Sequence, residues 1–197
     1  MSEAIQTDFQ RAVQLFSQGD ASAAERVALT LVQRDSSSPE IWNLLAVIQN
    51  RLGNPEGAIA AMENAIKLLP SQPVYHANLG EMYRRRNDLA SAIRCARRAV
   101  ELDPSFQGAY YNLANALKAD HQYEEAEKQY RRALKLDPRD LQSYQNLGNL
   151  YRETERLHEA AASYLLGWRI APERTEIAYS LGFREKNGRL TTSRRRR

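Results

Sequence analysis

The sequence has little of what marks secreted, membrane-spanning and disulfide-stabilised proteins. Cys95 is the only cysteine among 197 residues, so an internal disulfide cannot form and nothing indicates an oxidising compartment. No stretch approaches the roughly 20 consecutive apolar residues that a bilayer-spanning helix needs. The first residues, Met1 to Ile5, lack the basic region and following apolar run of a secretory signal. We therefore expect a soluble protein of the cytoplasm.

Histidine is also scarce, and the reactive side chains do not form a pattern that predicts catalysis. His76, His121 and His158 lie in different segments, with no cysteine or carboxylate at metal-ligand spacing. Cys95 has no evident base partner, which indicates an inert thiol. The glycine-containing segment 53–57 is not followed by the Lys-Ser or Lys-Thr of a phosphate-binding loop. We expect no enzyme activity, no cofactor and no metal site.

The net charge is small, and one short segment accounts for it. The chain has 28 basic and 24 acidic residues, a net charge of +4. Arg194 to Arg197 supply four of the positive charges, so the remaining 24 basic and 24 acidic residues balance. A folded domain that binds duplex nucleic acid usually carries a basic patch on its own surface. Nucleic-acid binding through this tail is therefore the weakest functional interpretation.

What the chain does contain is a repeat with a period of 34 residues. Tyr110, Asn112, Leu113 and Asn115 recur as Tyr144, Asn146, Leu147 and Asn149. Alanines recur at matching offsets further along, and a proline closes each copy. A short unit copied many times builds a solenoid, which offers an extended surface rather than an enclosed pocket. The repeat therefore favours binding over catalysis.

This pattern resembles the tetratricopeptide repeat (TPR) family. Its signature is a large residue at position 4, Leu at 7, Gly or Ala at 8, Tyr at 11, Ala at 20 and 27, an aromatic at 24 and Pro at 32. The matching repeats are 5–38, 39–72, 73–106, 107–140 and 141–174. The first repeat has Asp8 and Ser36 where a large residue and proline are expected. The resemblance covers about residues 5–188, nearly the whole chain.

Packing chemistry explains why such a repeat would fold. Small residues at positions 8, 20 and 27 let two helices, A and B, approach closely, while large residues at positions 4, 7, 11 and 24 fill the remaining space. Turn-forming pairs such as Gly53-Asn54 lie between the two helices, and the proline at position 32 ends helix B. We predict an all-α fold, a right-handed α-solenoid of helix–turn–helix TPR units.

The end of the chain has two open interpretations. A sixth repeat begins with Ala178, Leu181 and Gly182 and stops near Gly188. Either a capping helix over 175–187 completes a solenoid of residues 1–188, with a disordered basic tail at 189–197, or the chain is cut from something longer.

The resemblance implies a ligand-binding face. In TPR proteins, positions 2, 5, 6, 9, 12 and 13 of helix A generally face a concave groove. The residues that we expect to contact a peptide there are Asn43, Asn78, Arg84, Tyr111, Asn112, Asn115, Lys118, Gln145, Asn146, Asn149 and Arg152. A side-chain amide has both donors and an acceptor, so the asparagines could hold a peptide backbone without reading its sequence. They could equally bond to neighbouring helices.

Two other sets on this face also have alternative interpretations. Position 12 holds Arg84, Lys118, Arg152 and Lys186. They are either a basic stripe that favours an acidic or phosphorylated peptide or a solvated face. Tyr111 is either an anchor for a partner side chain or a partly exposed packing residue. The carboxylate clamp of co-chaperone TPR domains is not expected, because its three basic places hold Tyr111, Glu176 and Ser180.

We therefore predict a protein–protein interaction module, an adaptor or scaffold, that binds an extended peptide or partner protein, possibly acidic. The alternative is the substrate-recognition region of a glycosyltransferase resembling the O-linked N-acetylglucosamine transferases, whose asparagine ladder the repeats resemble, with its catalytic domain outside this chain. The partner's identity does not follow from the sequence, and self-association through the solenoid ends stays open.

Overall fold

The structure is a computed structural model that describes residues 2–172, 183–186 and 189–192. It contains ten α-helices and one two-stranded antiparallel sheet in those residues. Packing divides the chain into two compact parts, Met1–Asn112 and Leu113–Arg197, with the boundary inside α7. The predicted α-solenoid class of helix–turn–helix units is confirmed for α1 to α10.

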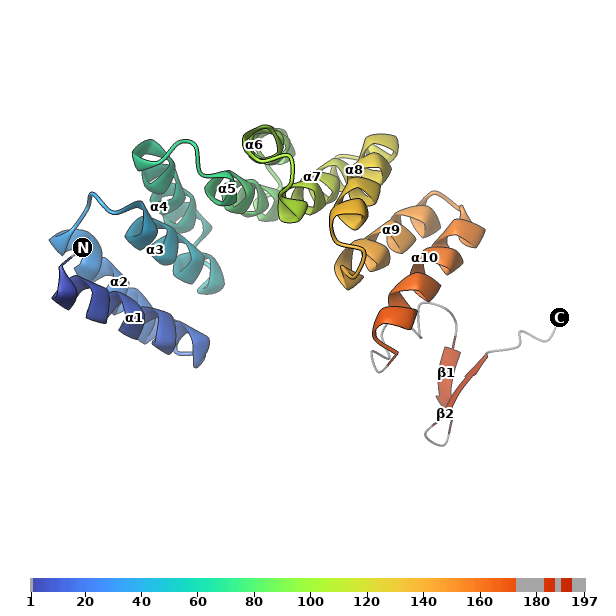
Figure 1. Ribbon diagram of the computed structural model, residues 1–197, viewed down its shortest axis with the longest axis horizontal. Helices are drawn as coiled ribbons and strands as arrows, with labels where there is room; N and C mark the ends of the chain where they lie inside the picture. Colours follow the sequence, from blue (N-terminus) through green and yellow to red (C-terminus); the bar gives the residue numbers. More distant parts are fainter. Residues whose placement is uncertain (1, 173–182, 187–188, 193–197) are drawn as a thin grey trace. The chain divides into compact units, whose positions relative to one another are not determined.

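The helices follow the repeat boundaries read from the sequence (Figure 1). In the N-terminal part they are α1 (Glu3–Ser17), α2 (Ala21–Arg34), α3 (Pro39–Arg51), α4 (Pro55–Leu68), α5 (Pro73–Arg85), α6 (Leu89–Leu102) and the start of α7 (Gln107–Ala119). The C-terminal part contains the rest of α7, α8 (Tyr123–Leu136), α9 (Leu141–Glu153) and α10 (Leu157–Ile170). Odd-numbered helices are the A helices of the repeats and even-numbered helices are the B helices.

Small buried residues let each A helix approach its B helix. Ala12, Ala46 and Gly80 occupy position 8, and Ala12 and Ala46 are completely buried. A Cβ on Gly80 would lie 3.1 Å from the Ala92 carbonyl oxygen on α6, so the two backbones leave no room for a larger side chain. The pairs α1–α2, α3–α4, α5–α6 and α9–α10 all pack in this way.

The turn between helices A and B has the same left-handed backbone conformation in all five repeats. The residue at position 15 has a positive φ in each: Gly19 (91°), Gly53 (77°), Asn87 (61°), His121 (58°) and Glu155 (60°). The residue after it caps helix B in three repeats: the side chains of Asp20, Asn54 and Asp88 accept hydrogen bonds from the backbone N–H of Ala23, Gly57 and Ser91. Asp, Asn and Ser are preferred N-caps because they satisfy such unpaired donors.

Position 4 joins each A helix to the end of the preceding repeat. The contacts are Trp42 Nε1 to the Ser36 carbonyl oxygen at 2.9 Å, His76 Nε2 to Pro70 O at 2.9 Å, and Tyr110 Oη to Pro104 O at 3.2 Å. A carbonyl oxygen can only accept, so His76 donates from Nε2. His76 therefore makes the contact that Trp42 and Tyr110 make in the neighbouring repeats.

Position 11 joins α3, α5 and α9 to the B helix before each of them. The contacts are Gln49 Nε2 to Glu25 Oε1 at 3.1 Å, Tyr83 Oη to Glu63 Oε1 at 3.0 Å, and Tyr151 Oη to Glu127 Oε1 at 2.9 Å. In each contact, a polar group at position 11 donates to a carboxylate on the preceding helix B. Successive repeats are thus held by directional bonds as well as by apolar packing.

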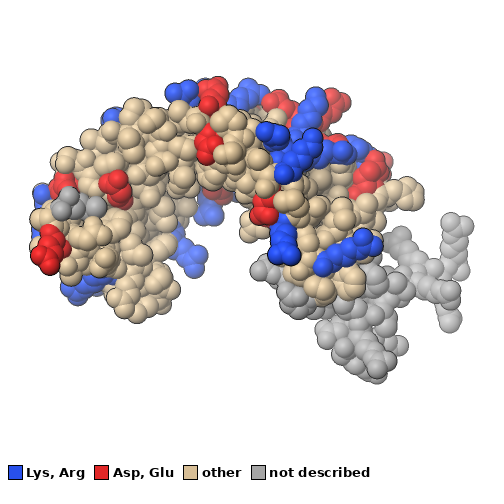
Figure 2. All heavy atoms as spheres, in the orientation of Figure 1, with Lys and Arg blue, Asp and Glu red and all other residues tan. Residues whose placement is uncertain are grey.

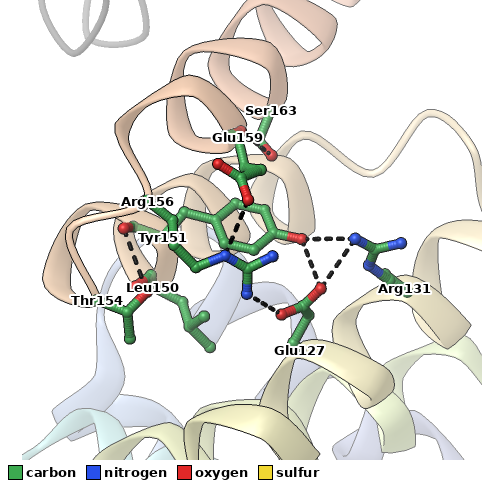
Figure 3. Close-up of polar contacts among 8 residues, drawn as sticks. All are labelled: Glu127, Arg131, Leu150, Tyr151, Thr154, Arg156, Glu159 and Ser163. Atoms are coloured by element: carbon green, nitrogen blue, oxygen red, sulfur yellow. Dashed lines mark hydrogen bonds and ion pairs between the residues drawn. The ribbon is translucent and has the colours of Figure 1, made fainter.

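The Tyr151 contact belongs to a larger network in the C-terminal part (Figure 3). Arg156 donates to Glu127 at 2.6 Å and to Glu159 at 3.0 Å, and its guanidinium lies 4.5 Å from the centre of the Tyr151 ring. Arg131 donates to Tyr151 Oη at 3.0 Å and to Glu127 at 2.9 Å. Burial raises the pKa of the Glu127 carboxyl, but hydrogen bonds from Arg156 and Tyr151 outweigh it, so the pKa is lowered overall.

The structure corrects the prediction for the end of the chain. Where a helix over 175–187 was expected, β1 (Phe183–Lys186) is a strand, and β2 (Arg189–Thr192), in the tail expected to be disordered, pairs with it. Lys186 lies opposite Arg189 in the register, with Asn187-Gly188 between the strands in sequence. Asn-Gly is a strong signal for a two-residue hairpin turn, and the helical interpretation overlooked it. The rest of the predicted helix and tail lies outside the described residues.

Candidate peptide-binding face

All eleven predicted contact residues lie on A helices. In the N-terminal part they are Asn43 on α3, Asn78 and Arg84 on α5, and Tyr111 and Asn112 on α7. In the C-terminal part they are Asn115 and Lys118 on α7, and Gln145, Asn146, Asn149 and Arg152 on α9. Arg152 is exposed and the other ten are partly buried. On α9, Asn146, Asn149 and Arg152 recur at intervals of three, and Gln145 lies four residues before Asn149, which places these residues on one side of the helix.

The asparagines at position 6 bond to the A helix of the preceding repeat or to its side chains. Asn78 Nδ2 donates to Asn43 Oδ1 at 3.4 Å, and Asn112 Nδ2 donates to the Ala77 carbonyl oxygen at 3.2 Å. In the C-terminal part, Asn146 Nδ2 donates to Asn115 Oδ1 at 3.0 Å. These amides therefore take part in helix–helix contacts, as one of the two interpretations predicted.

The asparagines at position 9 accept hydrogen bonds from buried tyrosines of their own repeat. Tyr130 Oη donates to Asn115 Oδ1 at 2.5 Å, and Tyr164 Oη donates to Asn149 Oδ1 at 2.7 Å. Both rings are almost completely buried, and burial raises the pKa of Tyr164. A buried hydroxyl without an acceptor is costly, so these amides fix the ring position. The sequence signal was the joint occurrence of Asn at position 9 and Tyr at position 24, which the prediction did not connect.

Two of the cations at position 12 lie against carboxylates. Arg84 makes two hydrogen bonds to Glu81, at 2.7 and 2.9 Å, and Arg85 adds a third at 2.9 Å. Burial raises the pKa of Glu81, but the bonds from Arg84 and Arg85 outweigh it and lower the pKa overall. Lys118 Nζ lies 2.7 Å from Glu153 Oε1. The expected basic stripe is thus largely neutralised at these two positions, and the side chain of Lys186 lies outside the described residues.

The reactive side chains elsewhere have structural explanations. Cys95 is partly buried, and burial raises the pKa of its thiol to about 11, so it is protonated at neutral pH and a poor nucleophile. His121 occupies the left-handed turn position, with Nδ1 2.8 Å from Tyr123 Oη. Within residues 2–172, 183–186 and 189–192, no three His, Cys, Asp or Glu side chains cluster to hold a metal ion. In the same residues, no helix is both long and apolar enough to cross a membrane.

Comparisons with known proteins agree with this architecture. Family profiles described as tetratricopeptide repeat match residues 9–73, 108–140 and 129–162, and a profile described as TPR repeat matches residues 80–120. Protein FlbA of Caulobacter vibrioides is 30% identical over 77 residues, which are 39% of this chain. The chain spans only 13% of the length of FlbA.

Solved structures share the fold at low sequence identity. A thermophilic TPR protein of Thermus thermophilus superposes with a TM-score of 0.76 and 21% identity, covering 90% of this chain and 96% of its own. YrrB, described as a TPR protein with an unusual peptide-binding site, has a TM-score of 0.68 and 18% identity, covering 88% of this chain and 89% of its own. At these identities the likeness shows the fold alone. Together with the four profile matches and the recurring helix pairs, it shows that the chain belongs to the tetratricopeptide repeat family.

Proposed function

We propose that the chain is a protein-binding adaptor that holds an extended segment of another protein along its A helices. The observation that carries this proposal is the recurrence of partly buried amide side chains at positions 5, 6 and 9 of the A helices, on α3, α5 and α7 within the N-terminal part and on α7 and α9 within the C-terminal part. An amide contacts a peptide backbone through donors and an acceptor at once. YrrB, which has the same fold, is described as having a peptide-binding site.

The hydrogen bonds that the asparagines make within the scaffold are compatible with peptide binding. Each amide has two N–H donors and an oxygen with two lone pairs, and the bond from Tyr164 to Asn149 uses one of those lone pairs. A side chain that is already held in place loses less conformational entropy when a ligand binds. The scaffold bonds would therefore prepare the amides for a partner.

The charges refine what the partner should carry. Because Arg84 and Lys118 are each beside a glutamate, we place any acidic side chain of the partner at Arg152, which is exposed on α9. Gln145 lies on the same side of α9 and would contact the backbone nearby. The partner would then be an extended, mostly polar segment with a single important acid, encountered in the cytoplasm.

The glycosyltransferase alternative depends on the asparagine pattern alone. The bonds of Asn115 and Asn149 to buried tyrosines account for the position-9 part of that pattern without a glycosyltransferase. We therefore favour the adaptor function.

A quantitative pull-down from lysate of the source organism tests this proposal. The bait would be the wild-type chain and a Gln145→Ala/Arg152→Ala variant, with Lys67→Ala, at an exposed position of α4, as the control. We expect mass spectrometry to find a partner whose yield falls at least about tenfold with the double variant and is unchanged with the control. Partners captured equally by all three baits would contradict the proposal.

A further inference from the structure

A second surface lies away from the A-helix residues described above, in the C-terminal part. A cavity of about 260 Å³ is bounded by α8 and α10 and floored by α9. Its apolar wall includes Leu134 on α8, Leu147 on α9, and Ala162 and Leu166 on α10. Small-molecule sites usually occupy about 300–1,000 Å³. This volume suits one large side chain of another protein better than a whole ligand.

The position of Leu166 in the repeat makes the cavity unusual. Positions 22 and 26 of helix B hold Lys128 and Arg132 on α8, but Ala162 and Leu166 on α10. Leu166 is 44% exposed. Its counterpart on α8, Arg132, is a charged residue that suits such an exposed position. An apolar residue that replaces a cation at a surface position and lines a cavity needs an explanation beyond the packing of its own repeat.

The opposite rim of the cavity is basic. From Lys128 to its end at Leu136, α8 has four basic residues and no acidic one, and basic side chains are conspicuous over α8 in Figure 2. Arg131 lines the cavity with a side chain that is 59% exposed. Glu159, also at the rim, is bound by Arg156. The surroundings of the apolar cavity therefore favour negative charge in a partner.

Two side chains at the rim are already held in place. The hydroxyl of Tyr151 lies between Glu127 and Arg131, so its ring, which lines the cavity, is held at both ends (Figure 3). Arg131 bonds to the same two residues. A cavity wall with fixed rotamers loses little entropy on binding, which is what a specific anchor site needs.

We propose that the α8–α10 cavity is a second protein-docking site, which takes one large apolar side chain flanked by acidic residues. The apolar side chain would contact Leu134, Leu147 and Leu166. A neighbouring carboxylate would bond to Arg131 on the α8 rim through Nε and Nη1, because the bonds to Glu127 and Tyr151 both come from Nη2. The walls of this surface are B helices, and its floor on α9 contains none of the predicted peptide-contact residues. The chain would therefore hold two partners, or two segments of one partner, at separate sites.

Selection from a displayed library of random 12-residue peptides tests this site. We expect the wild-type chain to enrich peptides with one Leu, Phe or Trp next to Asp or Glu. Binding of a fluorescein-labelled selected peptide, followed by anisotropy, should weaken at least about tenfold in Leu166→Lys, which places a cation at this position as in the preceding repeat. Leu165→Lys is the matched control, since Leu165 is 37% exposed but does not line the cavity, and circular dichroism melts would confirm that both variants fold.

The outcomes separate the two faces of the protein. Loss of binding in Leu166→Lys and retention in Leu165→Lys and in Gln145→Ala/Arg152→Ala would support the docking site. Loss in Gln145→Ala/Arg152→Ala with retention in Leu166→Lys would place the peptide on the A-helix face and overturn the docking site, while the adaptor function stands. Enrichment of peptides with no apolar–acidic pattern would overturn it as well.

Discussion

Individual side chains in this protein serve the scaffold and the proposed binding face together. Asn149 was predicted from its position in the repeat to contact a peptide. In the structure its side-chain oxygen accepts a hydrogen bond from the buried hydroxyl of Tyr164. The position of a residue within its repeat could be read from the sequence, because the repeat has a fixed period of 34 residues. The hydrogen-bond partner of Asn149 was missed, although Asn at position 9 occurs together with Tyr at position 24 in both repeats where the bond forms. The length of the bond depends on how closely the two helices pack, which the sequence does not give.

The bond between Asn149 and Tyr164 predicts a non-additive effect on stability. Asn149→Ala should destabilise the fold by about 1–3 kcal/mol, because a hydroxyl that is almost completely buried loses its acceptor. Tyr164→Phe added to Asn149→Ala should cost less than the two single changes together. Urea unfolding of the four proteins measures the coupling. Additive free energies of unfolding would show that the bond does not form.

Glu127 predicts a specific dependence of stability on pH. Its folded pKa is below its ordinary value of 4.5, so its stabilising contribution is complete above about pH 4.5 and is lost as the pH falls through the folded pKa. Glu127→Gln should lower the free energy of unfolding by about 1 kcal/mol at pH 7, because its bonds to Arg156, Arg131 and Tyr151 weaken. The difference from wild type should shrink below pH 4.5.

Chemical denaturation between pH 3 and 7 measures that difference. Glu124→Gln, at an exposed site on the same helix, is the control and should show almost no change. A Glu127→Gln deficit that is the same at pH 3 and pH 7 would mean that the network is not electrostatic in origin.

The helix pairs repeat one packing arrangement, and most features of this arrangement could be predicted from the sequence. The all-α class and the pairing of helices follow from the alanine and proline positions, because small residues and helix ends have direct steric causes. The hairpin of β1 and β2 was missed. There the incomplete sixth repeat suggested a helix, and the Asn-Gly sequence, which favours a hairpin, was given no weight.

The left-handed turn at position 15 predicts a cost for side chains with a Cβ. Gly53 has a φ of 77°, and a Cβ there would meet no atom within 4 Å. Gly53→Ala should therefore destabilise through backbone strain alone, by about 1 kcal/mol. Gly53→Asn should cost less, because Asn tolerates this conformation and Asn87 occupies the same position in the third repeat. Thermal melts of the three proteins check this order, and an alanine variant as stable as wild type would contradict it.

Across the chain as a whole, the same positions of the A helix recur in every repeat. In a stack of repeats, stability comes from neighbouring contacts, so a ligand-binding face can vary in charge without disturbing the fold. Here the variation is visible: the cations at position 12 of the third and fourth repeats lie against carboxylates, and Arg152 of the fifth is exposed. The family could be recognised from the sequence, and the location of the binding face is a prediction from it. The neutralising ion pairs do not, because they depend on side-chain placement.

The most direct test of the account is site-specific photocrosslinking in living cells of the source organism. The photoreactive amino acid p-benzoylphenylalanine would replace Tyr111 or Gln145 on the A helices, and Leu68, exposed on helix B of the second repeat, as the control. We predict that both A-helix positions crosslink to the same partner protein and that position 68 does not. A partner that crosslinks only from position 68, or from all three positions equally, would contradict the claim that the A helices bind it.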